Sequence, residues 1–173
     1  MMLAVSRRVC PAPQTVLQLA EKSKGVPRAL RVGDVGIDGI LRGGISAGAI
    51  TEIVGQAGMG KTQLCLTLAV TAALAESFGG AGGRALYIDT ESRFSTMRML
   101  EIASAKHPAA FGSQQQADAL ARNVLVSRPR TCAEMMNDLM NLQSFIIEHC
   151  VKYDTPCILV CTSFGGASSC AHS

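Results

Sequence analysis

Tryptophan is absent from this 173-residue sequence, aromatic residues make up only 4%, and charged residues only 17%. Hydrophobic residues nevertheless reach 48%, which is enough for a core and excludes a largely disordered chain. No apolar run approaches the roughly 20 residues of a transmembrane helix, and no secretory signal is recognisable. The length fits one domain, so we expect a soluble, single-domain protein.

The cysteines lack the spacing of a disulfide framework or a zinc site. There are seven of them, an odd number, and no C-x-x-C pair. We therefore expect reduced thiols in a nuclear or cytosolic compartment. A metal site formed by Cys157, Cys161, Cys170 and His172 is an alternative, although this spacing matches no standard zinc pattern.

Positive charge is concentrated at the start of the chain. Residues 1–31 contain six basic side chains and one acidic one, whereas the remaining residues contain ten basic and twelve acidic ones. Three interpretations of residues 1–31 stay open: a solvated linker, an arm that contacts nucleic acid, or an Arg-rich transit peptide.

Apolar runs alternate with helical patterns from about residue 32 onward. We expect buried strands at 49–54, 85–89, 123–127 and 156–161, and helices at 15–22, 37–42, 61–77, 94–106 and 132–150. This alternation predicts an α/β domain with a parallel sheet and helices on both faces. Its expected bounds are 32–161, after the basic arm and before a disordered tail at 162–173. Met135, Met136 and Leu139 belong to an apolar stripe at helical spacing, which we interpret as core filling.

The strongest motif is a complete G-x-x-x-x-G-K-[ST] pattern between an expected strand and an expected helix. Its residues are Gly55, Gln56, Ala57, Gly58, Met59, Gly60, Lys61 and Thr62. The glycines allow successive backbone N–H groups to converge on an anion, and the helix that follows adds its positive N-terminus. Lys61 supplies a cation for phosphates and Thr62 a hydroxyl for Mg²⁺. The pattern predicts a nucleotide-binding P-loop.

Two carboxylates follow the expected strand at 85–89. Ligands of open α/β sheets bind at the carboxyl ends of the strands, so Glu91 is a candidate to polarise the water that attacks a γ-phosphate. The alternative is a structural role for Asp89 or Glu91, as a helix cap or in a surface ion pair.

Several segments together resemble the RecA-type eukaryotic recombinases. They are Gly43-Gly44-Ile45, Gly48–Ile53, the P-loop, Thr62–Cys65 and Tyr87–Ser92. Residues 84–103 most resemble the B-type paralogues of that family, especially their plant and algal forms. The resemblance implies a RecA-like P-loop NTPase core that binds ATP and Mg²⁺, with Glu91 as the catalytic glutamate and Arg98 against the adenine. It also implies a nuclear role in homologous-recombination repair, in a complex with other paralogues.

Three departures from the family's pattern weaken the expected activity. The usual small N-terminal helical domain and the loops that line the DNA channel have no counterpart in the sequence, which resembles a truncated core, incomplete at its C-terminal side. The expected strand at 156–161 leads into Thr162, where the family has an aspartate that orders Mg²⁺. We therefore expect weak or no ATP hydrolysis and weak DNA binding.

A non-catalytic interaction module is an alternative function; a small-molecule P-loop kinase is less well supported, because no Arg-rich lid is recognisable.

Overall fold

A computed structural model of the protein describes residues 15–17, 29–111, 113–149 and 157–162. Within these ranges, a parallel three-stranded sheet has β3 (Arg84–Asp89) at its centre, between β4 (Val124–Ser127) and β5 (Cys157–Thr162). Tyr87 lies level with Val126 on β4 and with Val160 on β5. The predicted α/β class and the strands at 85–89, 123–127 and 156–161 are confirmed. No end of these strands differs from its predicted position by more than one residue.

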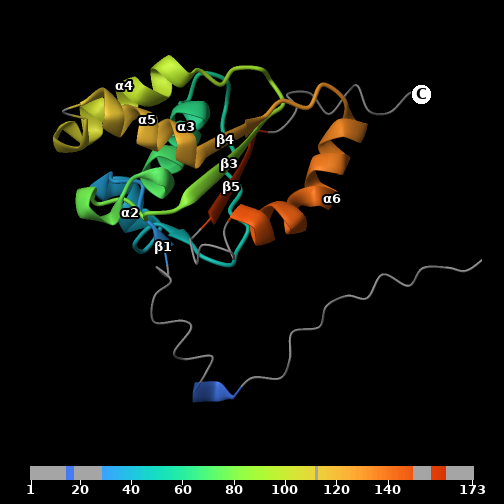
Figure 1. The fold of residues 1–173 in the computed structure, drawn as a ribbon, viewed down its shortest axis with the longest axis horizontal. Coiled ribbons are helices and arrows are strands. Elements are labelled where there is room, and N and C mark those ends of the chain that lie inside the picture. Colours follow the sequence, from blue (N-terminus) through green and yellow to red (C-terminus); the bar gives the residue numbers. More distant parts are fainter. Residues whose placement is uncertain (1–14, 18–28, 112, 150–156, 163–173) are drawn as a thin grey trace, which may run out of the picture.

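Helices lie on both sides of this sheet, as the alternation predicts (Figure 1). The chain passes from β3 to β4 through α4 (Thr96–Lys106) and α5 (Gln114–Asn123), and returns to β5 through α6 (Cys132–His149). Right-handed crossovers that run in opposite directions across a parallel sheet place their helices on opposite faces. Accordingly, α6 lies across the strands from α3, α4 and α5 in Figure 1. None of the described helices is both long enough and apolar enough to cross a membrane.

The core lies between the sheet and α3 (Lys61–Ala73), where every residue from Leu66 to Ala73 is buried. This segment is apolar on nearly all sides, as expected of a helix enclosed by neighbours. The helix ends at Ala73, earlier than the predicted Ser77, and a 3-10 turn occupies Glu76–Phe78. The glycine turn after it folds back on the helix, because the amides of Gly82 and Gly83 donate to the carbonyls of Leu74 and Ala72. These bonds satisfy the carbonyls at the helix end and stop the helix there.

A short antiparallel hairpin precedes the P-loop. Its strands, β1 (Ala29–Leu30) and β2 (Ile45–Ser46), flank α2 (Val35–Ile40), which Asp34 caps through the Ile37 amide. Gly44 has a positive φ of 125°, and a Cβ there would lie 2.3 Å from the Leu30 carbonyl oxygen, so only glycine fits. The helix predicted at 37–42 is present two residues earlier, while the sequence did not reveal the two-residue strands.

The predicted strand at 49–54 is wrong. These residues have an irregular backbone, and Ile50 is fully exposed at 101%. Their composition favours a strand, but a strand also needs a hydrogen-bonded neighbour. No strand in the described part of the chain pairs with this segment.

Two further differences concern helices. The sequence analysis did not predict α5, which is polar and buries only Leu120. Ser113 and Gln116 form a capping box at its start. On α6, the apolar stripe does not fill the core: none of its described side chains is buried, and Met140 is 76% exposed. Helical spacing therefore identified the helix but not the extent to which its neighbours cover it.

Other predicted segments fall largely outside the described residues. Of the helix expected at 15–22, Val16 and Leu17 have helical backbone. Of the tail expected at 162–173, the described residue is Thr162, which ends β5. Most of the basic arm at 1–31 lies outside the described ranges, apart from 15–17 and the β1 segment.

Candidate nucleotide site

The P-loop forms an exposed turn at the start of α3. Gly58 and Gly60 have positive φ values of 84° and 86°, and Gly60 is the N-cap of the helix. Residues of opposite handedness alternate along such a turn and direct their N–H groups to one side. Among the described residues, the amides of Ala57, Gly58 and Gly60 have no hydrogen-bond acceptor. The loop thus has the donors that a phosphate requires.

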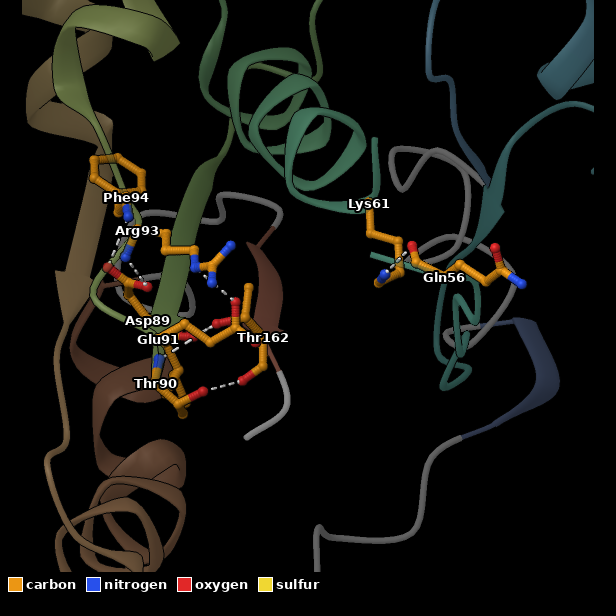
Figure 2. Close-up of polar contacts among 9 residues, drawn as sticks. Gln56, Lys61, Asp89, Thr90, Glu91, Arg93, Phe94 and Thr162 are labelled. Carbon is orange, nitrogen blue, oxygen red and sulfur yellow. Dashed lines mark hydrogen bonds and ion pairs between the residues drawn. The ribbon is translucent and has the colours of Figure 1, made fainter. Parts of the chain in front are cut away.

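Lys61 reaches back across this loop. Its Nζ donates to the carbonyl oxygens of Gly55, at 2.7 Å, and Gln56, at 2.9 Å; Figure 2 shows the side chain turned toward Gln56. An ammonium group has three donors, so one remains for a phosphate oxygen, and the two carbonyl contacts can be exchanged for stronger charge-assisted bonds.

Thr62 lies next to Lys61 in the first turn of α3 and is partly buried. Its hydroxyl oxygen is of the kind that Mg²⁺ takes as a ligand. No group of three His, Cys, Asp or Glu residues in the described ranges could hold a metal ion. The alternative metal site includes Cys170 and His172, which lie outside those ranges.

Asp89 has a structural role at the end of β3. Its carboxylate is 1% exposed and accepts hydrogen bonds from the amides of Arg93, at 3.0 Å, and Phe94, at 2.8 Å. Arg128 Nε lies 3.5 Å from the same carboxylate. Asp89 takes neither of the roles that the sequence left open for it: Ser95 is the N-cap of α4, and the buried Asp89 carboxylate instead binds amides in the loop before that helix.

Glu91 lies in the loop that Asp89 closes. Its carboxylate is 3.4 Å from Arg93 Nε in an ion pair at the surface. Figure 2 shows the start of α3 and the end of β3 at the same end of the sheet, with Thr162 between Glu91 and Lys61 in this view. Glu91 and Lys61 make no direct contact with each other. The candidate catalytic residue is therefore at the correct end of the sheet, but it is engaged by Arg93.

Arg98 joins α4 to α3. Its Nε donates to Gln63 Oε1 at 2.8 Å, and its Nη1 pairs with Glu101 at 2.8 Å. Gln63 follows Thr62 directly, so Arg98 lies near the helix that begins at the P-loop. This position is compatible with the predicted adenine contact, which stays a prediction.

The ends of β3 and β5 are joined by two threonines that the sequence analysis did not identify as a pair. Thr162 Oγ1 donates to the Ile88 carbonyl, at 3.2 Å, and accepts from the Thr90 amide, at 3.3 Å. Thr90 Oγ1 donates in turn to the Thr162 carbonyl. Thr162, at the position where the family's pattern has an aspartate, is thus bonded within the sheet.

Burial raises the pKa of the thiol near this site. Cys65 lies one turn after the P-loop, and its pKa is raised, first by burial and then by the neighbouring Cys161. A raised pKa keeps the thiol protonated, and it is the thiolate that reacts.

A glycine-rich loop that opens a buried helix against a parallel α/β sheet defines a P-loop protein. The chain belongs to the Rad51 family, whose model, described as Rad51, matches residues 27–163. The predicted resemblance to the RecA-type recombinases is confirmed.

Several relatives are similar over part or most of the chain. DNA repair protein RAD51 homolog 2 from Arabidopsis thaliana is 35% identical over 155 residues, which cover 86% of this chain and 41% of the relative. The protein of the same name from Mus musculus is also 35% identical, over 86% of this chain and 43% of its own length. DNA repair and recombination protein RadA from Metallosphaera sedula is 40% identical over 53% of this chain and 28% of its own length. The chain spans about two fifths of the first two relatives.

Proposed function

We propose that this chain binds ATP with Mg²⁺ through residues 55–62 and acts in homologous-recombination repair of DNA in the nucleus. The observation that carries the proposal is the loop at the start of α3, in which three amides are unpaired and Lys61 Nζ folds back to the carbonyls of Gly55 and Gln56. The names of the relatives, all DNA repair proteins, supply the process.

Each site residue has one role in this proposal. Loop amides and Lys61 hold the phosphates, and Thr62 contributes its hydroxyl to Mg²⁺. Arg98 contacts the adenine from the first turn of α4. Glu91 orients the attacking water once it leaves Arg93. ATP would supply the phosphoanhydride bond that is cleaved, and Mg²⁺ would neutralise its charge.

We further propose that turnover by this chain is slow. Thr162 brings no negative charge to the end of β5, and Glu91 is paired with Arg93 rather than directed at the loop.

Other recombinase paralogues are the proposed partners. Residues 1–31 are proposed as a basic arm that gives weak, non-specific contact with DNA, ahead of a partial core at 32–161.

Titration calorimetry with Mg-ADP tests nucleotide binding. We expect Lys61→Ala to weaken binding by about 30-fold, which corresponds to about 2 kcal/mol for a lost charge-assisted contact. Arg122→Ala is a matched control, because it removes one positive charge from the exposed end of α5 and should leave the affinity unchanged. Equal affinities of the wild type and Lys61→Ala would refute the site.

A non-catalytic interaction module is the second candidate function. The observation that favours it is the exposure of Met136 and Met140, one turn apart on the outer side of α6. Such a module would bind a sister paralogue with the same affinity whether or not Lys61 is replaced, whereas a nucleotide-dependent protein would not. Co-sedimentation of wild type and Lys61→Ala with the paralogue distinguishes the two.

A further inference from the structure

We infer that Arg128 is a positioning residue, which acts through Asp89 to fix the loop that carries Glu91. The inference rests on the proposed ATP site for its functional meaning. Its structural part can be tested without nucleotide.

The loop after β3 is folded around a buried carboxylate. Asp89 is 1% exposed and accepts from the amides of Arg93 and Phe94, so the chain turns back on itself across four residues. A buried carboxylate is costly unless it is paired and hydrogen-bonded. Asp89 therefore depends on a cation as well as on these amides.

Arg128 is that cation, and it comes from a different strand. It follows β4, its Nε lies 3.5 Å from Asp89 Oδ2, and its Nη2 donates to the Phe94 carbonyl at 3.1 Å. One guanidinium thus contacts both the carboxylate that begins the loop and the carbonyl that ends it. The planar fork of arginine allows these two contacts at once, which the single ammonium of lysine does not match.

The opposite side of the loop is anchored to β5. Thr90 exchanges two hydrogen bonds with Thr162, as Figure 2 shows. Ser92, between the two anchors, has a φ of +54°. A non-glycine residue keeps this left-handed conformation only where its surroundings fix it. Glu91 is therefore held between two anchors in a strained turn.

Phe94 extends the anchoring into the core. Its ring packs edge-on against Tyr87, with 5.0 Å between the ring centroids. The half-exposed Arg128 side chain lies outside this packing. Replacing Arg128 should therefore loosen the loop and leave the core intact.

Amide hydrogen exchange on the full chain tests the structural part of the inference. In Arg128→Ala, the amides of Arg93 and Phe94 should exchange at least tenfold faster, while the amides of α3 keep their protection. Arg128→Lys should give an intermediate increase. Arg130→Ala, two residues further on, is the control, and it should change neither amide. Unchanged protection of both amides in Arg128→Ala would overturn the inference.

Nucleotide assays test the functional part. Arg128→Ala should keep the Mg-ATP affinity within about twofold of the wild type and lower kcat at least tenfold, because it displaces Glu91 and leaves the P-loop intact. A parallel loss of affinity, or an unchanged kcat, would contradict a positioning role. Absence of Mg-ADP binding by the wild type would instead refute the proposed function, and the exchange result would still decide whether Arg128 holds the loop. Far-UV circular dichroism checks that Arg128→Ala is folded, and Arg128→Lys replaces it in both assays if it is not.

Discussion

Replacing Tyr87 by phenylalanine should stabilise the protein. Tyr87 is completely buried on the central strand, and its hydroxyl has no hydrogen-bond partner among the described residues. The ring itself is well packed against Phe94. Tyr87→Phe keeps this ring and removes only the hydroxyl, so it isolates the cost of burying an unpaired polar group.

The expected magnitude follows from that cost. Protein mutational data place the burial of an unpaired hydroxyl at about 1–3 kcal/mol. The small void left by one oxygen atom offsets part of this gain. We expect a net increase of about 1 kcal/mol in the free energy of unfolding, or roughly 2–4 °C in Tm for a domain of this size.

Urea denaturation followed by far-UV circular dichroism measures the change, since the sequence has no tryptophan. Tyr87→Leu is the control, because it also removes the hydroxyl but loses the ring contact, and it should destabilise the protein by about 2 kcal/mol or more. A Tyr87→Phe protein that is less stable than the wild type would show that the hydroxyl is hydrogen-bonded and that the reasoning is wrong.

The same residue predicts a loss of stability at alkaline pH. Burial, followed by the nearby Cys65, Asp89, Glu91 and Cys161, raises the pKa of Tyr87 above its ordinary value. In the unfolded chain this phenol ionises near pH 10, whereas in the folded chain it stays neutral. The stability that comes from keeping Tyr87 neutral is therefore fully present below pH 10 and is lost as the pH rises further. Tyr87→Phe should show a smaller loss of stability over that range.

Two further predictions concern turnover and DNA. Glu91→Gln should abolish whatever ATP hydrolysis the wild type shows without changing its Mg-ADP affinity; hydrolysis as fast as that of a full-length recombinase, surviving this change in a steady-state phosphate-release assay, would exclude Glu91 as the catalytic residue. DNA binding should require residues 1–31 and weaken steeply with salt, because the arm's net charge of +5, six basic minus one acidic residue, allows at most about five phosphate contacts. Salt-resistant binding by residues 32–173 in fluorescence anisotropy titrations would place the contact elsewhere.

Local sequence patterns were sufficient to predict the P-loop and the central strand. Gly58 and Gly60 have positive φ values, which glycine adopts without strain, so the motif itself indicates the turn. Likewise, 85–89 is a short apolar run whose length fits a strand buried on both faces, and five of the six residues of β3 are buried. Both features depend on residues that are adjacent in the chain, which makes them predictable.

Features that depend on distant residues could not be predicted in this way. Whether 49–54 becomes a strand depends on a neighbour to pair with, which composition does not specify. The Arg128–Phe94 contact joins residues 34 positions apart, and the Arg98–Gln63 contact joins residues 35 positions apart. For α5, the Ser113–Gln116 capping box was a readable signal that the sequence analysis overlooked.

Thr162 connects these observations to the expected slow turnover. A hydroxyl has one proton and two lone pairs, and Thr162 uses the proton on Ile88 and one lone pair on the Thr90 amide. What remains is one neutral lone pair, which cannot balance the charge of Mg²⁺ as a carboxylate does. The end of β5 therefore stabilises the loop of Glu91 and brings no negative charge to the site. Under the proposed function, the negative charge around Mg²⁺ must then come from the phosphates themselves, so this site favours holding the nucleotide over cleaving it.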